Sequence, residues 1–218
     1  SWPFATRPLS KGGGMAGGQG LPLAGVRVIE FTHMVMGPAA GLILADLGAD
    51  VIKIEPVEGD STRRLPGSGS GYFPMYNRNK RSLCVDLKAP EGRELVLKLI
   101  GGADVLIENF RPGTMEKLSI GSELLTQRNP RLIYCAMSGF GTDNVYRDRP
   151  ALDPVIQAMS GIMQLTGTEH SGPLKTGVLI SDFVPPLFGT IGIVAALFAR
   201  ASSGKGQRVD VSMLDATV

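Results

Sequence analysis

The chain has 218 residues, with 22 Lys and Arg against 20 Asp and Glu, 43% hydrophobic residues and a mean hydropathy of +0.11. This length fits one globular domain, and the apolar content excludes a chain that is disordered throughout. A net charge of +2 does not indicate a nucleic-acid-binding protein, in which basic residues gather on one face. The two cysteines, Cys84 and Cys135, lie in apolar runs, which predicts buried free thiols in a reducing compartment and thus a cytoplasmic protein.

Residues 1–20 show no hydrophobic periodicity and are mostly small or polar. They lack the basic start and the apolar core that a secretory signal requires. We therefore expect a tail that is disordered or foreign to the natural chain, followed by one folded domain over residues 21–218.

The rest of the chain alternates short apolar runs with helical patterns. The predicted strands are residues 26–31, 50–55, 82–87, 103–108, 131–137 and 207–211. The predicted helices are residues 38–48, 90–100, 114–118 and 122–128, and residues 57–79 are predicted to form a Gly-, Ser- and Arg-rich loop. Strands separated by helices of this length need crossover connections, which favours an α/β fold with a mainly parallel, Rossmann-like sheet flanked by helices.

Residues 183–199 form the longest uncharged stretch of the chain and follow directly on Asp182. Seventeen residues is the lower limit for a membrane span, but the stretch contains Pro185 and Pro186 and follows an α/β unit, so a core helix is expected and no membrane partner. Asp182 is predicted to cap this helix, with both prolines in its first turn. A carboxylate held ionised at a helix N-terminus among apolar neighbours would also suit a nucleophile.

Several common site motifs are missing from the sequence. The glycines of residues 12–20 precede the first strand, so they do not form a dinucleotide fingerprint, and neither a phosphate-binding P-loop nor a serine-hydrolase elbow occurs. His33 and His170 lie far apart and no cysteine pair has ligand spacing, so no metal site is expected. His33, at the end of the first strand, fits a packed residue as well as a functional one.

Basic residues cluster at two places that a phosphorylated ligand could use. Arg78, Lys80 and Arg81 lie just before a predicted strand; a solvated loop is the favoured interpretation on composition, and a phosphate clamp is the functional one. Arg111 and Lys117 follow another predicted strand, where open α/β sheets bind their ligands.

In their order along the chain, these motifs resemble those of the family III CoA-transferases, the CaiB/BaiF group, which includes formyl-CoA:oxalate and carnitine CoA-transferases. The matching stretches include residues 22–33 (PLAGVRVIEFTH), 37–38, 47–56, 77–82 (NRNKRS), 85–88, 104–113 (DVLIENFRPG), 138–141, 149–153 and 204–207. The resemblance implies a transferase that moves CoA from an acyl-CoA donor to a free carboxylic acid, with CoA as substrate and no permanently bound cofactor. It places the catalytic aspartate at Asp182, which would form an acyl anhydride and then a CoA thioester.

The resemblance also implies which residues contact CoA. They are Met34, Val35, Lys88, Asn109, Phe110, Arg111, Lys117, Arg149 and Asp153, with Arg78, Lys80 and Arg81 as phosphate-binding candidates. Met34, Val35 and Met36 would form an adaptable acyl pocket. Members of the family run to about twice this length and form interlocked homodimers, so we expect the chain to be the N-terminal part of the large, CoA-binding domain.

Two alternatives remain open at this point. The same superfamily contains α-methylacyl-CoA racemases, which need an acid/base histidine at the position of Leu152, where leucine cannot exchange a proton. The second alternative is an inactive CoA-binding module that keeps the binding residues without turnover.

Overall fold

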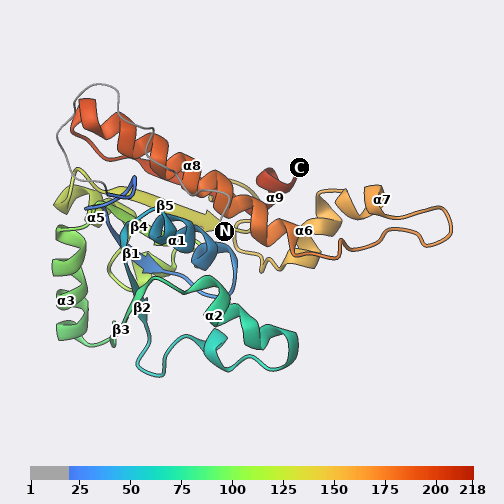
Figure 1. Ribbon diagram of the computed structural model, residues 1–218, viewed down its shortest axis with the longest axis horizontal. Helices are drawn as coiled ribbons and strands as arrows, with labels where there is room; N and C mark the ends of the chain where they lie inside the picture. Colours follow the sequence, from blue (N-terminus) through green and yellow to red (C-terminus); the bar gives the residue numbers. More distant parts are fainter. Residues whose placement is uncertain (1–19) are drawn as a thin grey trace.

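The computed structural model describes residues 20–218 of the chain, so the predicted tail lies outside the described residues except for Gly20. One sheet of six parallel strands has the order β3-β2-β1-β4-β5-β6 (Figure 1). The strands are β1 Arg27–Phe31, β2 Asp50–Glu55, β3 Arg81–Cys84, β4 Val105–Glu108, β5 Ile133–Ser138 and β6 Arg208–Ser212. The predicted α/β fold with a parallel sheet is confirmed.

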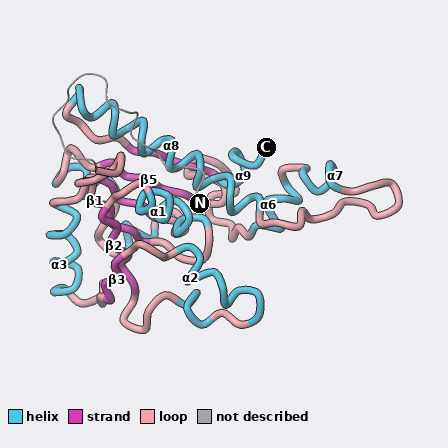
Figure 2. Tube along the Cα trace, in the orientation of Figure 1, coloured by secondary structure: helices cyan, strands magenta, loops and turns pink. Residues whose placement is uncertain are grey.

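Helices cover both faces of this sheet. They are α1 Met36–Asp46, α2 Tyr72–Tyr76, α3 Pro90–Gly101, α4 Thr114–Lys117, α5 Ser122–Arg128, α6 Asp153–Met159, α7 Ile162–Thr166, α8 Ile180–Ser203 and α9 Met213–Thr217. Helices α1, α8 and α9 pack on one face, and α3 and α5 on the other. Between α6 and α8 the chain runs outward as an arm that carries α7 (Figure 2).

Alternating strand residues supply the two cores. In β1, Val28 faces the core under α1 and α8, whereas Ile29 faces the core under α3 and α5. In β5, Cys135 and Tyr134 divide in the same way. Because the side chains of a strand point alternately to opposite faces, a strand buried on both sides reads as a continuous apolar run, and this is the signal that the sequence carries.

The strand order reverses between β1 and β4, because β2 follows β1 on one side and β4 adjoins it on the other. The carboxyl ends of these two strands carry Thr32 and Asn109 into adjacent loops. Ligands of open α/β sheets bind in the crevice at such a reversal. The topology therefore selects this edge of the sheet as the place to look for a site.

The structure corrects two details of the expected strands and loops. Residues 57–79 are not simply a loop, since they form two 3₁₀ turns, Ser61–Arg64 and Gly67–Gly71, followed by α2. Cys84, predicted to be buried, is exposed because β3 is an edge strand with three of its four residues open to solvent; Cys135 is buried as expected. Both cysteines are free.

Helix α8 differs most from its prediction. It begins at Ile180, with Leu179 as N-cap, so Asp182 lies inside the first turn and does not cap the helix. Pro185 and Pro186 consequently fall in the second turn, where each removes the bond that its N–H would have donated to the carbonyl four residues earlier. Those carbonyls belong to Ser181 and Asp182.

Among residues 20–218, α8 is the one helix long and apolar enough to cross a bilayer by length and composition. It packs against α1, β5 and β6, as expected for a core helix. Its outer side carries exposed apolar side chains, among them Leu187, Ile191 and Phe198.

Candidate functional site

The loop between β1 and α1 is held from both sides of the strand reversal. Asn109, directly after β4, accepts a hydrogen bond from the His33 N–H at 3.0 Å and donates one to the His33 carbonyl at 3.0 Å. On the other side, the Met34 N–H donates to Thr62 Oγ1 at 3.1 Å. Met34 has a φ of 63°, a conformation that non-glycine residues rarely adopt, so these bonds impose the shape of the loop.

Gly37 allows the close approach that this arrangement needs. A Cβ atom there would lie 2.5 Å from the Thr32 methyl carbon and 2.9 Å from Cγ of Asn109. Both neighbours belong to the loop contacts just described, so neither can withdraw without opening the site. A glycine at position 37 is thus required by packing at the start of α1.

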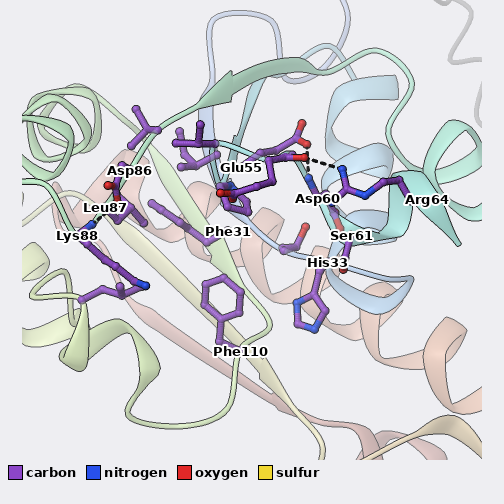
Figure 3. Close-up of a pocket in the computed structure, with 18 residues that line it drawn as sticks. Phe31, His33, Glu55, Asp60, Ser61, Arg64, Asp86, Leu87, Lys88 and Phe110 are labelled. Atoms are coloured by element: carbon purple, nitrogen blue, oxygen red, sulfur yellow. Dashed lines mark hydrogen bonds between the residues drawn. The ribbon is translucent and has the colours of Figure 1, made fainter.

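A first cleft of about 570 Å³, here named the β2 cleft, opens beyond the ends of β1, β2 and β3. Its lining includes Phe31, His33, Pro56, Ser61, Arg64, Val85, Leu87, Lys88 and Phe110. Figure 3 shows Lys88 at one end, His33 and Ser61 at the other, and the rings of Phe31 and Phe110 between them. An elongated cleft with aromatic rings at its centre and Lys88 at one end can hold a long ligand with an anionic group near Lys88; the carboxylates of Glu55, Glu58, Asp60 and Asp86 line the same cleft.

A second cleft of about 440 Å³, here named the aspartate cleft, lies on the other side of His33 and Phe110. Its lining includes Met34, Met36, Asn109, Arg111, Arg149, Leu152, Asp153 and Asp182. His33 and Phe110 line both clefts and stack on each other with ring centroids 5.7 Å apart. One ligand could therefore extend from the β2 cleft past these two rings to Asp182.

The carboxyl group of Asp182 is largely buried. Burial raises its pKa to about 7, and the negative charge of Asp153 adds to the rise. The direction of this shift runs against the expectation that the helix N-terminus holds this carboxylate ionised, because desolvation in the cleft disfavours the charged form. A carboxylate that is poorly solvated yet ionised near neutral pH is a more reactive nucleophile than one in water.

Asp153 supports the turn that carries Asp182. Its side chain is buried, and its Oδ1 accepts the Ser181 N–H at 2.9 Å while its Oδ2 accepts Gln157 Nε2 at 2.6 Å. Gln157 in turn accepts the Thr176 N–H at 2.9 Å. Asp153, predicted as a ligand contact, thus lines the cleft and also fixes the start of α8.

The proposed phosphate clamp at residues 78–81 is not formed. The partners are Asp46 for Arg78, Glu30 for Lys80 and Asp50 for Arg81, with nitrogen–oxygen distances of 3.0, 2.8 and 2.6 Å. The Lys80 side chain is only 2% exposed. Lys80 is therefore an interior residue, because the loop before β3 turns it inward against the end of β1, and none of the three residues lines either cleft.

Two other predicted contacts are placed differently from the expectation. The Val35 side chain is 1% exposed and packs with Ala39, Leu42 and Tyr76, so it does not line the acyl side of the aspartate cleft as Met34 and Met36 do. Lys117 is exposed on α4 and lines neither cleft.

The structure adds residues that the pattern left out. Arg64 and Ser61 line the β2 cleft, and the available signal was the Gly59-Asp60 turn after β2. His33, for which two interpretations were open, lies at the junction of the clefts.

Comparison with known proteins gives the site its context. The sequence model described as CoA-transferase family III matches residues 23–218. The chain belongs to this family. The family III chain is 45% identical over 202 residues to an acetyl-CoA:oxalate CoA-transferase of Acetobacter aceti, covering 90% of this chain and 52% of that protein.

Two further relatives agree with this assignment. A succinate–glutarate CoA-transferase of Agrobacterium fabrum is 42% identical over 205 residues, covering 89% of the family III chain and 51% of its own length. A crystal structure of a CaiB/BaiF family protein from Brucella suis superposes with a TM-score of 0.86 at 43% identity, covering 91% of this chain and 55% of that one. The chain thus spans about half the length of the curated relatives it matches.

Proposed function

We propose that the protein takes part in the transfer of CoA from an acyl-CoA donor to a free carboxylic acid, with Asp182 as the nucleophile. The observation that carries the proposal is that His33 and Phe110 line both clefts, so that the β2 cleft, with Lys88 at its far end, adjoins the cleft in which the partly buried carboxyl group of Asp182 has a raised pKa. In this arrangement the nucleotide end of CoA lies near Lys88 and the thioester lies at Asp182.

The reaction proceeds by exchange at one carboxyl group. An oxygen of ionised Asp182 attacks the thioester carbonyl carbon, the carbon–sulfur bond breaks, and CoA leaves as its thiolate, so that the acyl group forms a mixed anhydride with Asp182. The thiolate attacks the aspartyl carbonyl, which releases the donor acid as a carboxylate and leaves an aspartyl-CoA thioester. The acceptor carboxylate repeats these two steps in reverse, and Asp182 returns as a free carboxylate.

The surroundings of Asp182 suit these steps. The anhydride must be kept from water, and Met34 and Met36 supply an apolar part of the lining of the aspartate cleft. The flexible methionines fit more than one small acyl group. We propose a succinyl-CoA donor with a small di- or branched carboxylate as acceptor; the relatives named for succinate, glutarate and oxalate act on small acids.

Leu152 argues against the racemase alternative. It lines the aspartate cleft at the position where that chemistry needs a proton donor, and its side chain has none. The transfer reaction needs no resident cofactor, since CoA is the substrate. A cytoplasmic location and an interlocked homodimer of the complete protein belong to the same proposal.

A trapping experiment tests the nucleophile. Incubation with a panel of acyl-CoAs followed by hydroxylamine should give a hydroxamate at Asp182, because hydroxylamine cleaves the anhydride and thioester intermediates; peptide mass spectrometry locates it. Asp182→Ala should give no adduct and no CoA exchange but should still bind CoA. An inactive CoA-binding module would bind CoA and give no adduct in the unchanged protein.

The proposal also predicts a role for Lys88 in CoA affinity. Replacing this exposed lysine with alanine should weaken CoA binding by about 3- to 10-fold, the effect of one solvent-screened contact with a phosphate. Isothermal titration calorimetry measures the change, and Lys98→Ala on α3 is the matched control, since Lys98 is an exposed lysine outside both clefts. If the Lys88 variant and the unchanged protein bound CoA with equal affinity, the proposal that CoA binds in the β2 cleft would be refuted.

A further inference from the structure

Four charged side chains lie buried together behind the β1–α1 loop. Glu30, Lys53, Asp60 and Lys80, here named the charge network, have side chains no more than 4% exposed. Lys80 Nζ lies 2.8 Å from Glu30 Oε2, while Lys53 Nζ lies 3.5 Å from Glu30 Oε1 and 3.1 Å from Asp60 Oδ2. Two positive and two negative charges balance, which makes their burial tolerable.

Stability alone is a poor reason for such a network. Buried ion pairs lose about as much in desolvation as they gain in attraction, and apolar replacements of the same volume are often equally stable. A network of this kind therefore calls for a role that apolar packing would not fill, and the remaining hydrogen bonds of the two lysines indicate one.

Both lysines hold the backbone of the loop that separates the two clefts. Lys53 Nζ donates to the Thr32 carbonyl at 2.6 Å, and Lys80 Nζ donates to the Pro38 carbonyl at 2.8 Å. Thr32 and Pro38 bracket residues 33–37, which supply His33, Met34 and Met36 to the clefts. The charge network thus holds this loop by hydrogen bonds to a carbonyl group at its beginning and another at its end.

Asp60 connects the charge network to the middle of the loop through hydrogen bonds. Its Oδ1 accepts the Thr62 N–H at 2.8 Å, and Thr62 Oγ1 accepts the Met34 N–H at 3.1 Å. Met34 is the residue with the unfavourable positive φ. Its conformation therefore depends on a chain of contacts that begins at Lys53.

Helix α1 has a glycine at the position where it packs against the charge network. A Cβ atom at Gly41 would lie 1.8 Å from Glu30 Oε2 and 3.1 Å from Lys80 Nζ. Glycine inside a helix lowers helix stability, so this position gives up local stability to leave room for the Glu30–Lys80 pair. This second observation is independent of the hydrogen bonds.

We propose that the charge network is a positioning device for the β1–α1 loop. Asp60 lines the β2 cleft, but none of the four residues lines the aspartate cleft, so on that side they act through His33, Met34 and Met36, and thereby fix where the thioester meets Asp182. The inference rests on the proposed function in that the thioester is the group positioned. The proposal also assigns a role to residues 77–81 (NRNKR), because the buried lysine of this segment, Lys80, holds the loop in place.

The test compares two ion pairs at opposite ends of the sheet. Lys80→Met breaks the buried pair with Glu30, and Arg200→Met breaks the partly buried pair of Arg200 with Asp104, which precedes β4 at the end of the sheet remote from the clefts. We expect both variants to lose thermal stability, but only Lys80→Met to lower kcat, by about 10- to 100-fold, with KM for acyl-CoA within about 3-fold, since misplacement of reacting groups by about 1 Å has effects of this size.

A charge-balanced double variant separates positioning from stability. Glu30→Gln with Lys80→Met removes one charge of each sign, so stability should largely recover, whereas kcat should stay low because the Pro38 carbonyl has lost its lysine. Recovery of both stability and kcat would overturn the proposal, as would an equal loss of kcat in Arg200→Met. Gly41→Ala should behave like Lys80→Met, and Gly101→Ala, with nothing within 4 Å of the added carbon, should be silent.

A readout independent of catalysis distinguishes this inference from the proposed function. With ¹³C-methyl-labelled methionine, the Met34 and Met36 resonances should shift in Lys80→Met and Gly41→Ala, and stay in place in Arg200→Met and Gly101→Ala. Unshifted resonances in the first pair would overturn the positioning role whatever the activity. Shifted resonances in a protein without any CoA exchange would leave the positioning of the loop supported and refute the transferase proposal.

Discussion

Replacing Asp182 with asparagine should abolish CoA exchange while making the protein more stable above neutral pH. The loss of exchange should be at least about 10³-fold, because asparagine cannot form the anhydride or the thioester. The gain in stability follows from the raised pKa of Asp182, about 7 in the folded protein against an ordinary value of 3.8. Above pH 7 the folded protein must hold this carboxylate ionised in a poorly solvated cleft, and asparagine removes that cost.

The sign of the effect is specific. Below about pH 4 the carboxyl group is protonated in both the folded and the unfolded chain, so the two proteins should unfold at similar temperatures. As pH rises from about 4 to 7, the carboxyl group ionises in the unfolded chain while the folded protein keeps its proton, so the unchanged protein progressively loses stability relative to the variant, and the difference is complete above pH 7. With the cleft partly open to solvent, the difference at pH 8 is on the order of 1–2 kcal/mol, or about 2–6 °C in Tm.

Calorimetric melting of both proteins between pH 4 and pH 8 measures this difference. Glu108, whose pKa burial also raises to about 7, adds its own pH dependence to both proteins and cancels in the comparison. A variant that melts lower at every pH would show that Asp182 is held by favourable contacts and is not penalised by burial.

The second large effect concerns the pH at which exchange begins. Because the nucleophile must be ionised, kcat/KM should rise about tenfold per pH unit below pH 7 and level off above it. Asp153→Asn removes the negative charge that raises the pKa of Asp182, so this limb of the profile should move to lower pH. Asparagine can still accept the Ser181 N–H, although the bond from Gln157 is lost.

Glu94→Gln is the matched control for that experiment. It removes a negative charge from an exposed glutamate on α3, which pairs with Lys98 outside both clefts, and should leave the profile in place. If the rising part of the pH profile stayed at the same pH in Asp153→Asn as well, burial alone would set the pKa of Asp182. The role of Asp153 would then be limited to holding the first turn of α8.

The fold was predictable from the sequence because its strands are buried on both faces. A segment such as residues 131–137 therefore stands out as an apolar run beside helical patterns. The start of α8 was not predictable in the same way, since Asp182 and Pro185 favour a cap and a first turn locally. Tertiary contacts decide otherwise, because Asp153 binds the Ser181 N–H and the helix begins two residues before Asp182.

The site was predictable where a residue's role follows from its place at a strand end, as for Asn109. It was not predictable where burial decides the role. Lys80 lies in a segment whose composition indicates a solvated basic loop. Only the fold shows that its side chain pairs with Glu30 in the space left by the missing side chain of Gly41. Val35 likewise alternates with two cleft-lining methionines, but the turn into α1 directs it into the core.

The two prolines of α8 have a consequence for the position of the reactive carboxylate. Because Pro185 and Pro186 have no N–H to offer, the carbonyls of Ser181 and Asp182 are released from the hydrogen-bond ladder that holds the remaining turns together. The first turn is therefore tied to the helix behind it by fewer backbone hydrogen bonds, and the hydrogen bond from the Ser181 N–H to Asp153 anchors it from outside the helix. The position of Asp182 is accordingly set from α6, through Asp153, as well as from the body of α8.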